Sequence, residues 1–465
     1  MKWKPHEYQK RAVKFMVERA CAGLFLDPGL GKTATTLAAF HLLKKQGLLE
    51  KGKMLVICPL RPMYLTWPAE VKKWEEFSGL KVGLLHGPAK GSVLFDDDID
   101  IHVINPEGLK WLFAKGRVEN PADFWDMLVV DESTRFKHAD TERFKIIKPH
   151  LENFGRRYIL TGSPAPNGLL DLFGQVYLLD LGNSLGRYIT HYRATYFHQS
   201  YDGFNYEPNE GAAEKIKEKL APLALRMEAK DYLSLPPLIG ACGTGDPLIR
   251  KVQLPPLAKK IYETMENFMV SQLSDETVTA ASAAAVFGKC RQIANGGLYG
   301  SGEEVRSQNE IHDAKTEAVC ELLEELQGTP ALVAYEYGHD LDRLLTRLGQ
   351  NTPFIGGGVS QARFKQIEQK WNAGEIPVLL CQPQSVAHGL NLQGTKGNVI
   401  WHSLNPDLEL YEQLIARVWR QGQKERVFVH HIVAEGTVDE LIIKMLMRKD
   451  KTQRDLLVSL KEAYL

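Results

Sequence analysis

A glycine-containing loop near the N-terminus has the composition of a phosphate-binding loop. The segment Asp27–Thr33 contains Gly29 and Gly31, follows a short apolar run and precedes a helical pattern. Glycines let main-chain N–H groups turn toward phosphate oxygens, and the start of a helix adds favourable partial charge. Lys32 would reach the terminal phosphates of a nucleotide, and Thr33 would ligate Mg²⁺. The strict pattern has a further glycine at position 26, which this chain lacks.

Two adjacent carboxylates follow another apolar run. The run Met127–Val130 leads directly into Asp131 and Glu132. Because ligands of open α/β sheets bind at the carboxyl ends of strands, this pair could share a site with the phosphate loop. Asp131 would hold Mg²⁺ through water, and Glu132 would orient and deprotonate an attacking water molecule. Such a pair is also a common helix N-cap, but the phosphate loop in the same half of the chain favours the catalytic interpretation.

A third set of candidates lies near the C-terminus. Gln413, Arg417 and Arg420 fall on one face of a helix predicted over Leu408–Gln421. Two arginines at this spacing could stabilise transition-state charge on a γ-phosphate, an effect worth about 10³ to 10⁵ in rate where such residues are known. The alternative is an ordinary solvated basic face.

Hydrophobic patterning predicts the elements that must position these residues. Short apolar runs alternate with helical patterns in both halves, which predicts an α/β fold of buried parallel strands covered by helices. The predicted strands are Met54–Cys58, Ile101–Ile104, Met127–Val130, Tyr158–Leu160, Ala331–Tyr335, Val378–Cys381, Val399–Trp401 and Val427–Val433. A chain of 465 residues is too long for one core. We therefore expect lobes at 1–181 and 258–465, with a helical protrusion and linker at 182–257.

Composition limits the partners and the compartment. Lys plus Arg and Asp plus Glu both total 57, so a polyanion would need local basic surface. Residues 135–157 carry seven basic against three acidic residues, and residues 444–454 carry five against one. Six scattered cysteines disfavour a zinc site or a disulfide framework. Without a signal peptide or a long apolar run, we expect a soluble protein of a reducing cytoplasm.

These motifs together resemble the Swi/Snf-type ATPases of helicase superfamily two, over nearly the whole chain. The segments that carry the resemblance are Pro5–Gln9, Leu55–Leu60 with Trp67, Glu70 and Trp74, Leu160–Pro164 with Asn167, Gly389–Leu392, Asn405–Pro406, Arg417–Gln423 and Glu435–Glu440. The resemblance implies two RecA-like lobes with parallel sheets and an ATP site in the interlobe cleft. The chain departs from the family at His6, where Arg is usual, at Ser133 and Thr134 after the acidic pair, and at His388.

The resemblance also assigns roles to residues that patterning alone does not single out. Gln9 would read the edge of the adenine, and Gln413 would join the phosphate loop in binding the nucleotide. Contacts to nucleic-acid phosphates would come from the positions of Pro59, Asn105, Thr161 and Asn391, and such contacts do not read sequence. The implied ligands are ATP, Mg²⁺ and double-stranded DNA. Without appended modules, the chain is similar to minimal motors of bacteria and their phages, so we expect it in a bacterial or phage-infected host cytoplasm, as a monomer.

The leading hypothesis is an ATP-driven translocase on double-stranded DNA. The alternatives are a strand-separating DNA or RNA helicase, a clamp that binds without turnover, and a P-loop ATPase acting on proteins or small molecules. The Arg417–Gln423 run argues against the first alternative, since it favours the Swi/Snf branch over the RNA-unwinding branches. The intact catalytic candidates argue against the clamp, and the last alternative leaves the arginines unexplained. The polar, aromatic stretch Tyr192–Tyr206 is expected on the surface of the protrusion, as the segment that would bind a protein partner or separate DNA strands.

Overall fold

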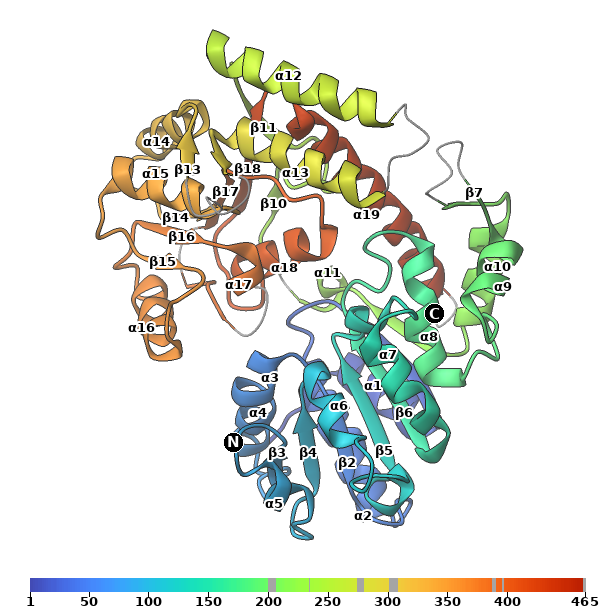
Figure 1. The fold of residues 1–465 in the computed structure, drawn as a ribbon. Helices are drawn as coiled ribbons and strands as arrows, with labels where there is room; N and C mark the ends of the chain where they lie inside the picture. The colour runs from blue at the N-terminus through green and yellow to red at the C-terminus, as the bar shows by residue number, and fades with distance from the viewer. Residues whose placement is uncertain are drawn as a thin grey trace. The chain divides into compact units, whose positions relative to one another are not determined.

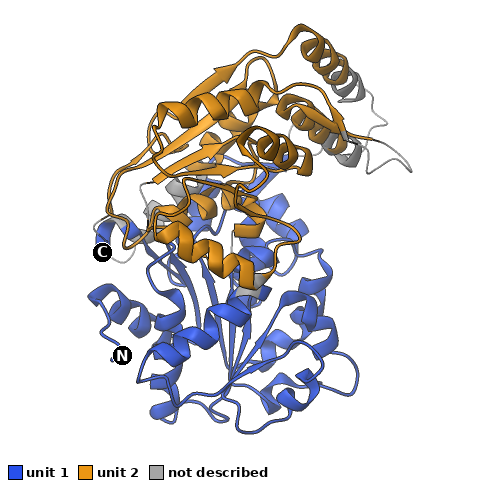
Figure 2. Ribbon diagram, turned by 90° about the vertical axis from the view of Figure 1, so that its left-hand side faces the viewer, with its two compact units in different colours: residues 1–233, 452–465 blue, residues 234–451 orange. Residues whose placement is uncertain are grey.

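The chain forms two compact units, which are shown in different colours in Figure 2. A computed structural model describes residues 1–199, 206–233, 235–273, 280–300, 308–386, 390–394 and 397–462. Unit 1 comprises residues 1–233 and 452–465, and unit 2 comprises residues 234–451. Among the described residues, no helix combines the length and the apolar character needed to cross a membrane.

Unit 1 is built on a fully parallel sheet of seven strands. Its strands, in spatial order, are β3 (Val82–Leu84), β4 (Ile101–Ile104), β2 (Met54–Ile57), β5 (Met127–Asp131), β6 (Arg156–Thr161), β1 (Cys21–Leu26) and β9 (Ala224–Met227). All residues of β2, β4, β5 and β9 are buried, as expected for strands covered on both faces.

Helices cover both faces of this sheet (Figure 1). The helices of unit 1 are α1 (Glu7–Val17), α2 (Lys32–Lys45), α3 (Leu60–Leu65), α4 (Trp67–Lys73), α5 (Lys90–Leu94), α6 (Leu109–Leu112), α7 (Glu142–Ile147), α8 (Leu172–Asp180), α9 (Ile189–Tyr196), α10 (Ala212–Leu220) and α11 (Ala229–Tyr232). Short 3₁₀ turns add η1 (Pro106–Gly108), η2 (Pro121–Asp123), η3 (Ser133–Phe136), η4 (Lys148–Asn153) and η5 (Leu169–Asp171), and β7 (Phe197–Gln199) pairs with β8 (Tyr206–Pro208). Every residue of α8 is buried, so this helix lies inside the unit.

Unit 2 contains a second parallel sheet. Its strands, in spatial order, are β10 (Leu238–Ile239), β18 (Val427–Ala434), β17 (Gly397–Trp401), β14 (Ala331–Ala334), β16 (Val378–Cys381) and β15 (Phe354–Ile355), with β11 (Leu248–Val252) also paired to β18. The helices are α12 (Pro256–Leu273), α13 (Ala280–Asn295), α14 (Ala314–Glu325), α15 (Gly338–Leu348), α16 (Gln361–Asn372), α17 (Pro383–Val386), α18 (Leu408–Val418) and α19 (Val438–Glu462), and β12 (Gly297–Tyr299) pairs with β13 (Gln308–Glu310). The last residues of α19, from 452 on, belong to unit 1.

The stretch 182–257 differs from the predicted protrusion and linker. Its residues 224–227 form β9 at one edge of the first sheet, while 238–239 and 248–252 form β10 and β11 of the second sheet. β9 is only four residues long and contains Arg226, and β11 alternates between half-buried and exposed residues. Such short or half-exposed edge strands lack the continuous apolar run on which the sequence prediction depended.

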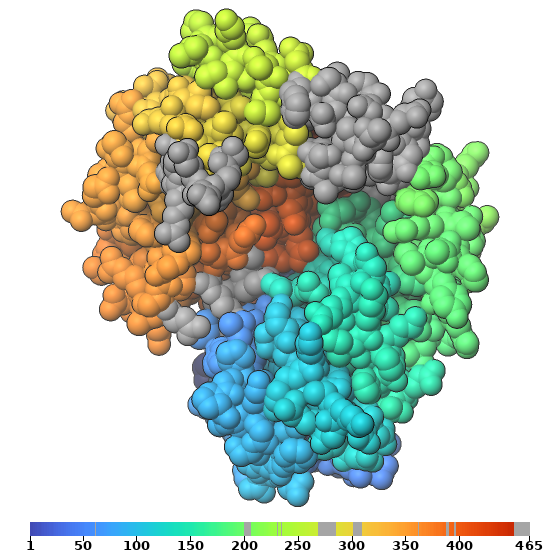
Figure 3. Space-filling view, in the orientation of Figure 1, coloured from blue at the N-terminus to red at the C-terminus, as the bar shows by residue number. Residues whose placement is uncertain are grey.

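The aromatic stretch in this region is also more buried than predicted. Tyr192 and Tyr196 are 0% and 6% exposed and belong to the core of unit 1, and the Tyr192 hydroxyl donates to the Leu169 carbonyl. Helices α9 and α10 cover the side of unit 1 next to α7 and α8 (Figures 1 and 3). The prediction of a surface aromatic cluster is therefore wrong for these two tyrosines, because the Tyr192 ring packs against Phe173 of α8 and the Tyr196 ring packs against Tyr192. Residues 200–205 lie outside the described residues.

Candidate functional site

The carboxyl edge of the first sheet gathers most of the candidates in unit 1. In a parallel sheet, all strands end at the same edge. The candidates that follow or end strands there are the loop Asp27–Thr33 after β1, Pro59 after β2, Asn105 after β4, Asp131 and Glu132 at the end of β5, and Thr161 at the end of β6. Gln9 comes from α1 instead. One edge thus brings the phosphate-loop and acidic candidates together.

The loop after β1 has the backbone of a phosphate cradle. Gly29 and Gly31 adopt φ angles of 91° and 77°, in the left-handed region that disfavours side chains. A Cβ on Gly31 would lie 2.7 Å from Nε2 of Gln9. Lys32 opens α2, so the N–H groups of the first helical turn follow directly on the glycines. In this structure its Nζ donates to the Leu26 carbonyl at 2.8 Å, which folds the ammonium back over the loop.

Gln9 ties the start of α1 to this loop. Its Oε1 accepts from the His6 amide at 3.0 Å, and its Nε2 donates to the Leu30 carbonyl at 3.3 Å. The side chain is 8% exposed. Gln9 therefore lies against the phosphate loop, and its contact with an adenine stays a prediction.

The acidic pair is held tightly at the end of β5. The Trp67 indole donates to Oδ2 of Asp131 at 3.1 Å. Burial, together with the neighbouring Glu132 carboxylate, raises the pKa of Asp131 to about 7, and the Lys32 charge opposes this shift. Glu132 adopts φ 54° and ψ 60°, a left-handed conformation that is strained for a residue with a side chain. A buried carboxylate with this desolvation cost fits a Mg²⁺ ion, which prefers oxygen ligands.

The predicted nucleic-acid contacts of unit 1 lie below the surface. Thr161 is 1% exposed, and its hydroxyl accepts from the Ser163 amide at 3.2 Å. Asn105 is 8% exposed, and its side-chain amide donates to Glu107 at 2.7 Å. Pro59 is also buried. These side chains shape the turns at the sheet edge, so a phosphate contact here would use main-chain groups of the same turns.

Two half-buried arginines of the basic stretch 135–157 support the fold. Arg156 donates to the carbonyls of Val17 and Arg19, and Arg157 donates to those of Leu151, Phe154 and Leu179. Both residues are at the start of β6, among the amino ends of the parallel strands. The phosphate loop lies at the other end of the strands. The residue count alone leaves a phosphate-contacting surface and a solvated face open for this stretch, and these two guanidinium groups are instead engaged with main-chain oxygens.

In unit 2, the two candidate arginines lie against the loop that contains Asn391. Arg417 donates to the Leu390 carbonyl at 3.5 Å, and its own carbonyl accepts from the Leu392 amide at 2.9 Å. Arg420 donates to Oδ1 of Asn391. The structure therefore brings three predicted residues of unit 2 together. The neighbouring residues His388 and Gly389 lie outside the described residues.

The helix that carries these arginines is shorter than predicted. Helix α18 ends at Val418, so Arg420 lies in the following turn, beyond the helical face predicted for it. At the C-cap, the Trp419 indole donates to the Pro236 carbonyl at 2.7 Å. Gln413 is 8% exposed within the helix, and its Nε2 donates to Glu409 at 3.0 Å.

Sequence reasoning did not find Arg226, which supports the phosphate loop from β9. This arginine is 6% exposed and pairs with Asp27, the first residue of the loop, at 2.5 Å. Its NH1 group also donates to the Phe25 carbonyl at 3.0 Å and to the Gly162 carbonyl at 3.3 Å. The signal in the sequence is an arginine inside a short apolar run, which requires a buried partner.

We expect replacement of Arg226 by alanine to destabilise unit 1, because it leaves the Asp27 carboxylate without its buried partner. Breaking such a pair costs roughly 3 kcal/mol, which lowers the unfolding midpoint by about 6 to 12 °C in a domain of this size. Thermal unfolding of the full chain measures this shift. The control is Arg250→Ala, because Arg250 pairs with Glu321 and Glu325 on the surface and such pairs contribute about 0 to 1 kcal/mol. Equal midpoints for the two variants would contradict the role of Arg226.

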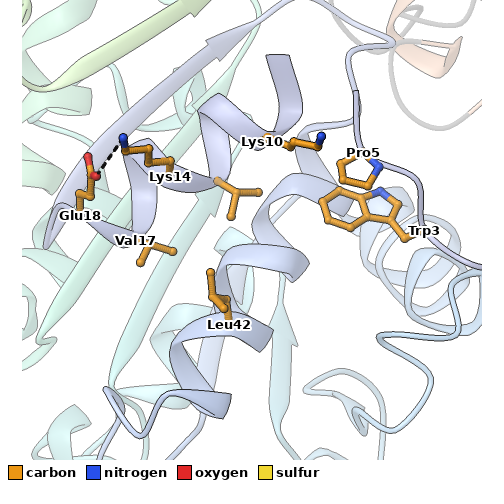
Figure 4. Close-up of a pocket in the computed structure, with 8 residues that line it drawn as sticks. Trp3, Pro5, Lys10, Lys14, Val17, Glu18 and Leu42 are labelled. Carbon is orange, nitrogen blue, oxygen red and sulfur yellow. Dashed lines mark ion pairs between the residues drawn. The ribbon is translucent and has the colours of Figure 1, made fainter. Parts of the chain in front are cut away.

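A hollow lined by the N-terminal segment, α1 and α2 is distinct from this site (Figure 4). It has a volume of about 300 Å³ and is lined by Trp3, Pro5, Lys10, Val13, Lys14, Val17, Glu18 and Leu42. None of these residues belongs to the phosphate loop or the acidic pair. The hollow is therefore not the nucleotide site.

Comparison with known proteins assigns the chain to a family. Residues 8–295 match the SNF2-related domain, and residues 314–422 match the helicase conserved C-terminal domain. Protein p41 of Acyrthosiphon pisum secondary endosymbiont phage 1 is 32% identical, over 98% of this chain and 98% of that protein. The DNA repair and recombination protein RDH54 of Saccharomyces cerevisiae is 24% identical, over 92% of this chain and 48% of that protein.

The chain thus spans nearly all of the phage protein and about half of the yeast one. Among solved structures, the Sulfolobus solfataricus SWI2/SNF2 ATPase core in complex with dsDNA is 23% identical, covers 100% of this chain and 95% of that chain, and superposes with a TM-score of 0.45. The first domain match covers more than half of the chain, and the second falls within unit 2. The predicted α/β architecture with parallel sheets is confirmed, and the chain belongs to the SNF2-related family of nucleic-acid-dependent ATPases in helicase superfamily two.

Proposed function

We propose that this protein uses ATP hydrolysis to move along double-stranded DNA. The observation that carries the proposal is the meeting of the phosphate loop and the acidic pair at one sheet edge, in a family whose members are nucleic-acid-dependent ATPases. Two features support DNA as the polymer along which the protein moves. The Arg417–Gln423 run resembles the Swi/Snf branch, and the yeast relative is named for DNA repair and recombination.

Unit 1 would bind the nucleotide and activate water. Main-chain N–H groups around Gly29 and Gly31 would hold the phosphates, with the Lys32 ammonium released from the Leu26 carbonyl to reach them. Thr33 and Asp131 would hold Mg²⁺, which when bound neutralises phosphate charge. Glu132 would accept the proton of the attacking water, and Gln9 would contact the adenine edge.

Unit 2 would supply charge to the transition state. Arg417 and Arg420 are the cations for the γ-phosphate, because each presents planar N–H donors that match phosphate oxygens. Gln413 would assist in holding the nucleotide. Asn391 is a predicted contact to a DNA phosphate. Its hydrogen bond with Arg420 therefore supports a link between ATP hydrolysis and DNA binding in this unit. On unit 1, the turns at Pro59, Asn105 and Thr161 would contact the DNA backbone.

The relationship to a phage protein supports a place for this activity in a bacterial or phage-infected cytoplasm. A monomer is the simplest form of such a motor, because the chain holds both matched domains.

Steady-state ATP hydrolysis tests the proposal. Rates are measured without nucleic acid and with duplex DNA, single-stranded DNA or RNA, with the Glu132→Gln variant as the blank. We expect strong stimulation by duplex DNA that weakens as salt rises, because phosphate contacts release counterions. Preferential stimulation by single strands or RNA would replace the proposal with a strand-separating helicase. A rate equal to the blank under every condition would leave only a clamp without turnover.

A further inference from the structure

Helix α8 lies between the turn after the acidic pair and the loop after β6. The turn is η3, which directly follows Glu132. The loop runs from Thr161 to Gly168. α8 is wholly buried. Two polar side chains one helical turn apart, Asp171 at its start and Gln175 within it, face both partners.

Gln175 forms the first connection. Its Oε1 accepts from the Ser133 hydroxyl at 2.7 Å, and its Nε2 donates to the Pro164 carbonyl at 2.6 Å and the Asp171 carbonyl at 2.8 Å. Two carbonyl oxygens can only accept, so the NH₂ end of the amide must face them and the Ser133 hydroxyl must be the donor. Gln175 and Ser133 are both 0% exposed, which makes this chain of bonds costly to break.

Asp171 forms a second connection, parallel to the first. Its Oδ2 accepts from the Asn167 amide at 2.9 Å and lies 3.6 Å from Nζ of Lys137, the residue that follows η3. Asp171 is 3% exposed. The same two chain segments are therefore joined twice across one helix.

The packing of Gly174 shows how close the helix and the turn lie. A Cβ on this residue would stand 2.0 Å from the Phe136 carbonyl oxygen and 2.9 Å from that of Lys137. The backbone of α8 thus rests directly on the turn, with no side chain between them. A displacement of the turn when Glu132 acts must move α8 or break its hydrogen bonds, because a packed interior does not deform gradually.

We propose that Gln175 is a positioning residue that couples the acidic pair to the Thr161–Gly168 loop, through Ser133 on one side and Pro164 on the other. This inference rests on the proposed function, in which the turn at Thr161 contacts DNA. Its consequence is specific: the Ser133–Gln175–Pro164 connection transmits DNA binding to the acidic pair. Hydrolysis without DNA does not need it, because Gln175 touches neither the phosphate loop nor the two carboxylates in the contacts of the described residues.

The test compares ATP hydrolysis with and without saturating duplex DNA in the full chain. Gln175→Leu removes the connection at nearly constant volume, and Gln175→Glu keeps an acceptor for Ser133 but loses the donor to Pro164. We expect both variants, and Ser133→Ala, to lower the stimulation factor about tenfold while the basal kcat and the KM for ATP stay within twofold of the parent chain. The double variant Ser133→Ala with Gln175→Leu should match the single variants, since all three interrupt one chain of bonds.

The matched control is Val176→Ala, which opens a void in the same helix without touching the connection, because Val176 is 1% exposed and belongs to the apolar core. It should keep the stimulation factor of the parent chain. An equal loss of stimulation in Val176→Ala, or parent-like stimulation in Gln175→Leu and Gln175→Glu, would overturn the inference. No stimulation of the parent chain by DNA would overturn the proposed function, and this inference with it.

Discussion

The Arg420→Ala variant should bind ATP with parent-like affinity and hydrolyse it about 10³ to 10⁵ times more slowly, the range known for arginines that stabilise phosphoryl-transfer charge. The reason is that the guanidinium would meet the γ-phosphate only as charge develops, so its loss affects the transition state more than the bound ground state. The measurements are the Kd of a fluorescent ATP analogue and the kcat for ATP at saturating duplex DNA. Saturating DNA matters because Arg420 also donates to Asn391, a predicted DNA contact.

The control for this variant is Arg426→Ala, which removes an exposed arginine six positions further along the chain. It should hydrolyse ATP at the parent rate. A parent-like kcat for Arg420→Ala, or a loss of ATP affinity as large as the loss of rate, would remove Arg420 from the transition-state role.

Replacement of Lys32 by alanine should reduce ATP turnover to below about 1% of the parent rate, with or without DNA. Loss of one preorganised donor to developing charge costs about 10² to 10³ in kcat, and this lysine would also contact the phosphates in the ground state. ATP affinity should therefore fall as well, in contrast to Arg420→Ala. Steady-state ATP hydrolysis and the binding of a fluorescent ATP analogue distinguish the Lys32→Ala variant from the Arg420→Ala variant.

Lys45→Ala provides the comparison for Lys32, since Lys45 is an exposed residue in the last turn of the same helix, α2. This variant should retain both affinity and rate. Turnover above about a tenth of the parent rate in Lys32→Ala would show that the loop after β1 does not hold the reacting phosphates.

The sequence predicted the central strands well because their signal is local. Ile101–Ile104 and Val378–Cys381 coincide with β4 and β16, since a strand covered on both faces must be apolar at nearly every position. The phosphate loop and the acidic pair were found for a related reason. Each follows such a strand directly, and parallel strands deliver their carboxyl ends to one edge.

The contacts that support the site could not be predicted in the same way. Arg226 reaches the Phe25 carbonyl across 201 positions, and Ser133 reaches Gln175 across 42. Hydrophobic periodicity predicts strands and helices, but it does not show which buried donor meets which acceptor. The end of α18 before Arg420 was missed, and the residue at its C-cap, Trp419, bonds to Pro236, which is 183 positions away in the sequence.

Displacement of a third strand from a DNA triplex tests translocation on duplex DNA most directly. The duplex carries a triplex-forming oligonucleotide at one end, and its release is followed over time with ATP, without ATP, and with the Glu132→Gln variant. We predict ATP-dependent release by the parent chain alone, with the underlying duplex left intact. Strong duplex-stimulated hydrolysis without release of the third strand, or separation of the duplex itself, would contradict the account of this protein as a double-stranded DNA translocase.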